Sequence, residues 1–260
     1  MKILVLGDAF VDTYHLGTTS RLSAEAPIPV VNITGVLEFP GGACNVRENL
    51  ISLGVDGRYL FQPTSRKVNY PVKNRLIVND TQVARWDTDD WCSMYQREDL
   101  LVLMEDFDAV IVSDYGKGSI TKEVIQILWE VTLPVFVDTK QSPVDWIGSE
   151  AVLFPNLEEY KRYQKEYDWI GRVVLKRGAE GLSLLEFGSV VLQRPAVARF
   201  VRDVNGAGDT VIAAFALALV GGRNIDWCLE FANAAAAVAV EHQFTYAPSL
   251  REVEYKLYQE

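Results

Sequence analysis

Short runs of apolar residues alternate along this chain with longer segments in which apolar residues recur every three or four positions. The short runs are typical of strands buried on both faces, and they lie at residues 3–6, 109–113, 135–137, 151–154 and 173–175. The longer segments are typical of helices, and they lie at residues 43–53, 121–130, 157–167, 209–220 and 225–241. Because most of the strands are followed by a turn and a helix, the pattern predicts an α/β domain with a mostly parallel sheet.

Two segments interrupt this alternation. Residues 14–38 contain Pro27 and Pro29 among β-branched residues, which indicates an extended segment at a sheet edge. Residues 72–87 have the pattern of a hairpin that turns at Asn79-Asp80. We expect the two segments to form a small second sheet, called the lid here, that projects from a single domain covering residues 1–260.

The composition of the chain limits the classes of molecule that the protein is expected to bind. A formal net charge of -10 argues against nucleic acid and anionic membranes, both of which need a basic face. It does not exclude ATP, because a phosphate site needs only local amides and a few lysines. The most apolar segments, residues 211–222 and 231–240, are shorter than the roughly 20 residues that span a bilayer. The three widely spaced cysteines predict reduced thiols, and we therefore expect a cytoplasmic protein.

The candidate chemistry lies at residues 203–210, Asp-Val-Asn-Gly-Ala-Gly-Asp-Thr, directly before a strongly apolar helix. Gly206 and Gly208 permit a tight turn in which the backbone amides, that of Ala207 included, point into one concavity. The helix that begins there adds its positive end, which suits a transferring phosphoryl group. Asp209 is then placed to accept the proton of an attacking hydroxyl. Turn chemistry alone leaves a second interpretation open, in which the glycines only shape the turn and Asp209 caps the helix.

The turn resembles the signature of the ribokinase/PfkB family of carbohydrate kinases, in which the equivalent aspartate is the catalytic base. Further motifs resemble the family in the same order along nearly the whole chain: the first strand and aspartate at residues 7–12, the di-glycine motif at residues 40–46, the NxxE motif at residues 156–159 and the strand-turn at residues 175–181. The resemblance implies a ribokinase-like, three-layer αβα domain with a mostly parallel central sheet and a small β-lid. It also implies transfer of the γ-phosphoryl group of ATP, with Mg²⁺, to a sugar hydroxyl.

The resemblance further implies roles for individual residues. The residues expected to bind the sugar are Asp12, Gly41, Gly42 and Asn45. The residues expected to bind the nucleotide are Lys140, Asn156, Glu159, Lys176, Gly178, Gly181 and Asn233. Glu159 would also act on the metal, through water. Structural interpretations stay open beside these: Asp12 could cap a turn, Asn156 and Glu159 could cap a helix, and Asn45 and Asn233 could bond only to backbone.

Residues 19–31, 113–118 and 137–140 are similar to heptose 7-phosphate kinases, which implies phosphorylation at C1 of D-glycero-β-D-manno-heptose 7-phosphate. A phosphorylated sugar needs cations beyond those that serve ATP. The candidates are Lys73, Arg75, Lys117 and Lys140, for each of which a solvated surface position stays open. Apolar residues on the expected lid strands, such as Val30, Ile33 and Val36, suggest a homodimer through the lid, as in relatives.

The chain departs from the family pattern in three places. Asn205 stands where heptose kinases usually carry threonine, residues 62–69 form a short polar link in place of a helix and strand, and residues 241–249 replace a glycine-containing turn. Two alternatives stay open, one because the family changes substrates through the lid and the early loops, and the other because of the shortened link. The first is a kinase for another sugar or for a nucleoside, and the second is a catalytically idle sugar- or nucleotide-binding protein.

Overall fold

The structure is a computed structural model that describes residues 1–57, 60–61, 71–88, 95, 100–101 and 104–258. The short link at residues 62–69, which distinguishes the chain from the family pattern, lies outside the described residues.

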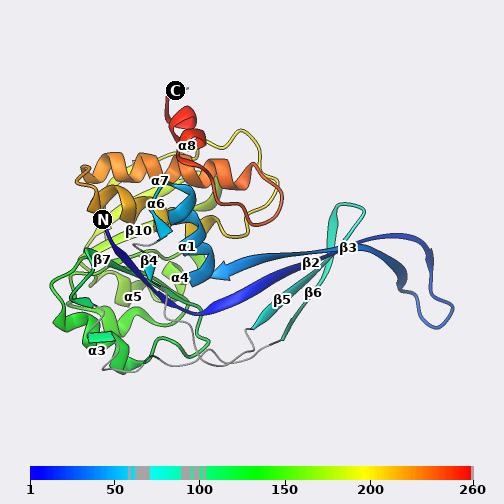
Figure 1. Cartoon of the computed structure of the whole chain (residues 1–260), viewed down its shortest axis with the longest axis horizontal. Coiled ribbons are helices and arrows are strands. Elements are labelled where there is room, and N and C mark those ends of the chain that lie inside the picture. The colour runs from blue at the N-terminus through cyan, green and yellow to red at the C-terminus, as the bar shows by residue number, and fades with distance from the viewer. Residues whose placement is uncertain (58–59, 62–70, 89–94, 96–99, 102–103, 259–260) are drawn as a thin grey trace.

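The main sheet of the described chain has eight strands in the order β12-β11-β10-β9-β8-β7-β1-β4 (Figure 1). Six of them run parallel to one another: β4 (Leu60–Phe61), β1 (Ile3–Gly7), β7 (Ala109–Asp114), β8 (Val135–Thr139), β9 (Val152–Leu153) and β10 (Arg172–Lys176). An antiparallel hairpin of β11 (Leu182–Glu186) and β12 (Ser189–Arg194) completes one edge. The predicted strands did not include this hairpin: β12 has the short apolar run Val190-Val191-Leu192, but most of the strand is exposed, unlike the central strands, which are buried on both faces.

Helices cover both faces of the sheet, so the predicted three-layer αβα fold is confirmed (Figure 1). One face is covered by α1 (Ala43–Ser52), α6 (Ala207–Val220), α7 (Ile225–Val240) and α8 (Leu250–Leu257). The other carries α3 (Lys122–Glu130), α4 (Leu157–Arg162), α5 (Gln164–Tyr167) and the 3₁₀ turn η2 (Pro143–Trp146). Alternate side chains of β1 enter opposite cores: Ile3 and Val5 face one core, and Leu4 faces the other. Among the described residues, no helix has the length and apolar character needed to cross a bilayer.

The helical segments follow the expected pattern with two differences. The helix expected over residues 157–167 is interrupted at Tyr163, which ends α4 and precedes α5. Helix α6 begins at Ala207, two residues earlier than expected, so Asp209 lies within its first turn. Most of α6 is buried because the helix lies between the sheet and α7, which explains why it is apolar on all sides.

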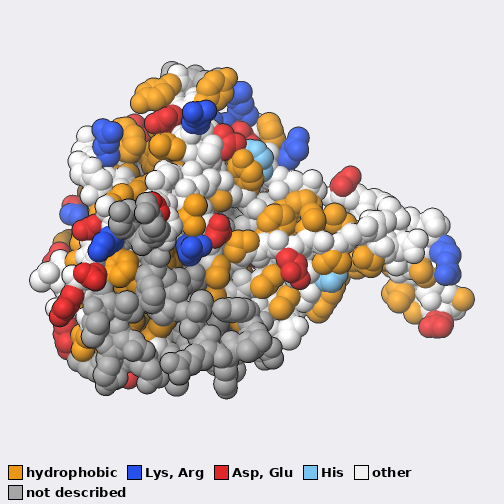
Figure 2. Space-filling model, viewed as in Figure 1, with side chains coloured by type: hydrophobic (Ala, Val, Ile, Leu, Met, Phe, Trp, Pro, Cys, Tyr) orange, Lys and Arg blue, Asp and Glu red, His pale blue; other side chains and the backbone are white. Residues whose placement is uncertain are grey.

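The lid is a four-stranded sheet in the order β3-β2-β5-β6 that projects from the domain (Figures 1 and 2). Its strands are β2 (Ala9–Leu22), β3 (Pro29–Gly42), β5 (Val72–Val78) and β6 (Thr81–Thr88). The expected hairpin is present, and Asn79 and Asp80 both adopt positive φ, as a type I′ turn requires. Strands β2 and β3 reach the domain at Ala9 and Gly42, so they are longer than the expected segment at residues 14–38.

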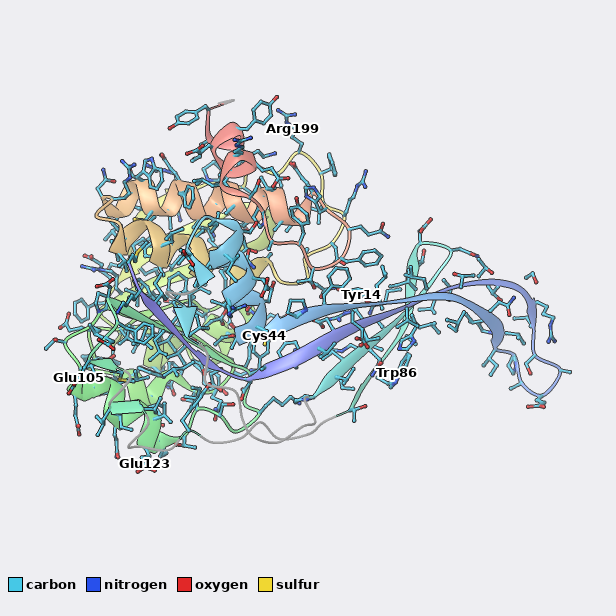
Figure 3. All side chains as sticks on the ribbon, viewed as in Figure 1. Tyr14, Cys44, Trp86, Glu105, Glu123 and Arg199 are labelled. Atoms are coloured by element: carbon cyan, nitrogen blue, oxygen red, sulfur yellow. The ribbon has the colours of Figure 1, made fainter. Side chains whose placement is uncertain are left out.

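The root of the lid packs against the main domain, whereas its outer part carries exposed apolar side chains. Its root packs against the loop after α7, where the ring of Tyr14 lies 4.8 Å from that of Phe244 and 5.6 Å from that of Phe39 (Figure 3). Farther out, large apolar side chains of the lid are exposed, Ile33 and Val36 by about half of their surface. Apolar side chains therefore gather along the projecting arm (Figure 2).

Candidate active site

The glycine turn lies where α6 begins, beside the carboxyl ends of β8 and β10. Gly206 has φ of 79°, and a Cβ there would lie 2.7 Å from Nδ2 of Asn45 and 2.9 Å from Cγ2 of Thr245. At Gly208 a Cβ would lie 3.2 Å from Nζ of Lys176. The close approach of α1 and of the loop after α7, together with the left-handed backbone, therefore requires glycine at 206.

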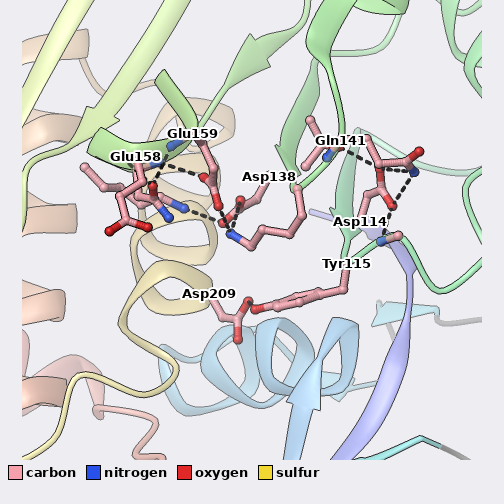
Figure 4. Close-up of polar contacts among 12 residues, drawn as sticks. Asp114, Tyr115, Asp138, Gln141, Glu158, Glu159 and Asp209 are labelled. Carbon is pink, nitrogen blue, oxygen red and sulfur yellow. Dashed lines mark hydrogen bonds and ion pairs between the residues drawn. The ribbon is translucent and has the colours of Figure 1, made fainter. Parts of the chain in front are cut away.

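Asp209 projects from the first turn of α6 and is 3% exposed. The Nδ2 of Asn45 donates to Oδ2 of Asp209 at 2.8 Å, and the hydroxyl of Tyr115 donates to Oδ1 at 3.2 Å (Figure 4). Burial raises the pKa of Asp209 to about 6, although the hydrogen bond from Asn45 acts in the opposite direction. A carboxylate with this pKa is ionised at neutral pH and can still accept a proton, which suits a general base.

A cluster of ion pairs lies beside the turn (Figure 4). Asp138, at the end of β8, pairs with Lys176 and, at 3.2 Å, with Lys140. Burial favours the neutral acid, yet the two ammonium groups hold the pKa of Asp138 below its ordinary value. Burial also opposes the charge of Lys140, but Asp138 and Glu159, the latter at 2.7 Å, raise its pKa. The ammonium groups of Lys140 and Lys176 are thus held in fixed positions close to the helix N-terminus.

Asn156 and Glu159 form a capping box at the start of α4. The side-chain oxygen of Asn156 accepts from the main-chain N–H of Glu159 at 2.9 Å, and Glu159 accepts from the N–H of Asn156 at 2.8 Å. The structural interpretation of the pair is therefore confirmed. Glu159 extends beyond it, because its second oxygen reaches Lys140. A role for either residue in binding nucleotide stays a prediction.

A cavity of about 380 Å³ opens beside the turn, between the strand-turn after β10 and helices α6 and α7. Its walls are mostly apolar, and it includes four residues expected to bind the nucleotide: Lys176, Gly178, Gly181 and Asn233. The small residues of α7, such as Ala236 and Ala237, let the helix line the cavity closely. Asn233 also donates to the carbonyl of Pro195 at 2.5 Å, so it bonds to backbone as the alternative interpretation proposed.

The cavity and the turn fit a nucleoside triphosphate. An apolar slot with one amide side chain suits a base, and the start of α6 offers its N–H groups and Lys176 to phosphates. A magnesium ion fits less directly, because the described residues contain no group of three or more His, Cys, Asp or Glu side chains that could hold a metal. Asp138 and Glu159 are both paired with Lys140. Asp138 and Glu159 therefore suit a magnesium ion that keeps its water ligands and binds mainly to the phosphates of the substrate.

On the other side of Asp209 the root of the lid supplies charged groups. Asp12 and Arg75 are both buried and form an ion pair of 2.5 Å, and Arg75 also lies 3.4 Å from Oδ1 of Asn205. The ammonium of Lys73 lies 3.3 Å from the ring centroid of Phe10 and forms no ion pair or hydrogen bond with any other described residue. Burial lowers the pKa of Lys73 to about 8. The structure thus places Asp12 on a lid strand rather than directly after β1.

Asp8 holds the loop that follows β7. Its buried carboxylate accepts the main-chain N–H groups of Tyr115 at 2.8 Å, Lys117 at 2.9 Å and Ser119 at 3.0 Å. Gly41 and Gly42 lie where β3 enters the domain, and a Cβ at Gly41 would lie 2.8 Å from Oδ2 of Asp12. The di-glycine motif is thus the point at which the lid closely approaches its own first strand.

The sequence predicted no individual role for Tyr115 or Asp138, and it offered Lys73 only as one of several candidate cations for the sugar phosphate. Tyr115 and Asp138 stand at the carboxyl ends of β7 and β8, where α/β sheets bind ligands, so their position after apolar runs was a usable signal. The position of Lys73 was harder to predict from the sequence, because it depends on how the lid folds back beside Phe10.

Comparisons with known proteins agree with this geometry. Residues 46–252 match the model of the pfkB family of carbohydrate kinases. The chain belongs to that family. The resemblance carried by the motifs is therefore confirmed.

Among the curated relatives of this pfkB-family chain are the bifunctional proteins HldE of Klebsiella pneumoniae (strain 342), 31% identical, and Yersinia pseudotuberculosis serotype O:1b, 30% identical. Each alignment covers 97% of this chain and 62% of the relative, so the chain spans less than two thirds of their length.

Solved structures share the pfkB-family fold. Arabidopsis thaliana ribokinase complexed with ribose and ATP matches with a TM-score of 0.76 at 20% identity, covering 99% of this chain and 98% of that one. The nucleoside kinase of Methanocaldococcus jannaschii matches with a TM-score of 0.74 at 17% identity, covering 100% and 99%. At these identities the likeness shows the fold, and it leaves the substrate to be argued from the site.

Proposed function

We propose that this pfkB-family chain is an ATP-dependent kinase that phosphorylates the C1 hydroxyl of D-glycero-β-D-manno-heptose 7-phosphate. The observation that carries the proposal is Asp209, a buried carboxylate with a pKa near 6 at the start of α6, between an apolar cavity and the cationic root of the lid. This arrangement provides a base with a nucleotide site on one side and an acceptor site on the other. The similarity of residues 19–31 to heptose 7-phosphate kinases supports the choice of sugar.

Asp209 accepts the proton of the sugar hydroxyl as that oxygen attacks the γ-phosphorus; the bond from this phosphorus to the β,γ-bridging oxygen breaks, and ADP leaves. The N–H groups at residues 206–208 and the positive end of α6 stabilise the negative charge on the transferring group. Lys176 and Lys140 add positive charge, and Asp138 keeps both ammonium groups in position. ATP would supply the phosphoryl group, and Mg²⁺ bound to its phosphates would neutralise part of their charge. Asn156 and Glu159 hold the start of α4 beside Lys140.

The sugar binds on the lid side of Asp209. Asp12 and Asn45 offer hydrogen-bonding groups to its hydroxyls, and Gly41 and Gly42 let the backbone approach it. The 7-phosphate is bound by Lys73, with Arg75 and Lys117 contributing charge from the same side. Lys73 suits the task because its ammonium is desolvated and has no anionic hydrogen-bond partner within the described chain, so a dianion gives it one.

The exposed apolar side chains of the lid support a homodimer that forms through the lid. Ile33 and Val36 are 52% and 51% exposed on a sheet only four strands wide, and burial against a second lid would remove them from water. We place the enzyme in the cytoplasm, in keeping with its acidic character and its small-molecule substrates.

The test is an ATP-consumption assay across phosphorylated and free sugars and nucleosides. We expect turnover with heptose 7-phosphate and a loss of about 10²- to 10⁴-fold in kcat for Asp209→Asn. Asp145→Asn, which changes a carboxylate on η2 away from the turn, is the control and should keep full activity. Turnover only with another acceptor would replace the substrate, and ligand binding without turnover in the wild type would make the protein an idle binder. Undiminished activity of Asp209→Asn would refute the mechanism.

A further inference from the structure

Tyr115 links three parts of the site that lie far apart in the sequence. It follows β7 directly, and its main-chain N–H is held by the buried carboxylate of Asp8 at 2.8 Å. Its side chain extends from the end of that strand toward α6 (Figure 4). Because the backbone is anchored by Asp8, the ring starts from a fixed point at the carboxyl edge of the sheet.

The ring of Tyr115 is held on several sides. Phe10 of the lid packs edge-on against it, with 4.9 Å between ring centroids and an angle of 78°. The ammonium of Lys73 lies 4.3 Å from its centroid, and that of Lys140 lies 5.4 Å from it. These contacts involve the ring alone and would persist in a phenylalanine. The hydroxyl therefore needs a separate explanation.

The hydroxyl of Tyr115 donates to Oδ1 of Asp209, while Asn45 donates to Oδ2. Each carboxylate oxygen thus has a fixed donor and keeps a further lone pair for a substrate proton. Burial, reinforced by the charge of Asp209, raises the pKa of Tyr115 well above its ordinary value, so the hydroxyl stays a donor. Donation to a carboxylate favours its charged form, which opposes the effect of burial on Asp209.

We propose that Tyr115 is a positioning residue for the base: its hydroxyl orients the Asp209 carboxylate and keeps it ionised at neutral pH. This inference rests on the proposed function, in which Asp209 is that base. The other groups that act on Asp209 are Asn45 of α1, Asp138 of β8, Lys140 just after β8, Lys176 of β10 and Lys73 of β5. All of these remain when only the Tyr115 hydroxyl is removed.

The experiment compares Tyr115→Phe with wild type in the pH dependence of kcat/KM for heptose 7-phosphate. We expect the acidic limb to move upward by about one pH unit and kcat at neutral pH to fall several-fold, while the dissociation constant for ATP stays unchanged. The matched control is Tyr160→Phe, which removes another tyrosine-to-carboxylate hydrogen bond, that of 2.8 Å to Asp168. This control should keep the wild-type profile.

A second measurement does not depend on turnover. Carboxyl-carbon NMR titration of aspartate-labelled protein, with Asp209→Asn to assign the signal, reads the pKa of Asp209 in wild type and in Tyr115→Phe. A higher pKa in Tyr115→Phe supports the inference even if no sugar is phosphorylated, in which case the proposed function alone fails. An unchanged Asp209 titration, or an equal shift in Tyr160→Phe, would overturn it.

Discussion

Substitution of Gly206 by alanine has two effects that can be measured separately: backbone strain and a steric contact with Asn45. In Gly206→Ala the new Cβ would meet Nδ2 of Asn45 at 2.7 Å and would also force alanine into a left-handed backbone, at φ of 79°. Gly222, just after α6, has nearly the same φ of 80°, yet a Cβ there would meet nothing within 4 Å. Gly222→Ala therefore reproduces the backbone strain without the contact.

The magnitudes of the two substitutions differ accordingly. The left-handed conformation costs an alanine about 1 to 2 kcal/mol, which is the whole effect expected at Gly222. At Gly206 the displaced amide of Asn45 also loses its 2.8 Å hydrogen bond to the charged Asp209, a contribution of about 1.5 to 3 kcal/mol. We therefore expect Gly206→Ala to lower the free energy of unfolding by about 2.5 to 5 kcal/mol.

The assay pairs urea unfolding at 25 °C with kcat for each variant. Gly206→Ala should lose at least about tenfold in kcat, because its Asn45 no longer holds the base, whereas Gly222→Ala should keep wild-type kcat. Equal stability losses in the two variants, or full activity in Gly206→Ala, would refute the assignment of Gly206 to the contact between α1 and α6.

Three further predictions follow from charge and exposure. The pKa of Asp209 is raised in the folded state, so the unfolded chain loses this proton at lower pH, and stability falls as pH rises from about 4 to 6. Asp209→Asn should therefore raise the free energy of unfolding by about 1 to 3 kcal/mol at pH 8 and leave it nearly unchanged at pH 3.5, as urea unfolding at both pH values would show. Lys73→Gln should raise KM for the phosphorylated sugar by about tenfold or more without altering KM for ATP, while Lys122→Gln, at an exposed position on α3, should change neither constant. Ile33→Asp should shift sedimentation from dimer to monomer, and Trp169→Asp, at an exposed apolar position outside the lid, should leave the dimer intact.

Much of the fold was predictable because its signals are local. The continuous apolar runs of β1, β7 and β8 mark strands that are buried on both faces, and the Asn79-Asp80 turn marks the lid hairpin. The β11–β12 hairpin was not among the predicted strands: its outer strand has the short apolar run Val190-Val191-Leu192, but that strand is largely exposed at the edge of the sheet.

The candidate site likewise has parts that could be predicted from the sequence and parts that could not. The glycine turn and Asp209 could be recognised from the chain alone, because residue type and order determine a turn that starts a helix. The partners of Asp209 could not: Tyr115 lies 94 residues away and Asn45 lies 164 residues away along the chain. The pairing of Arg75 with Asp12 likewise depends on which groups are buried side by side, whereas the capping box of Asn156 and Glu159 joins residues three apart and was one of the interpretations that the sequence offered.

The sequence by itself therefore determined most of the order of strands and helices, the glycine turn and the residue at its end. Only the tertiary structure decided how Asp209 is tuned, since burial, the two donors and the neighbouring lysines come from elements far apart in the chain. Hydrophobic periodicity and turn preference act over a few residues, whereas the pKa of a buried carboxylate depends on every charge and donor that folding brings around it.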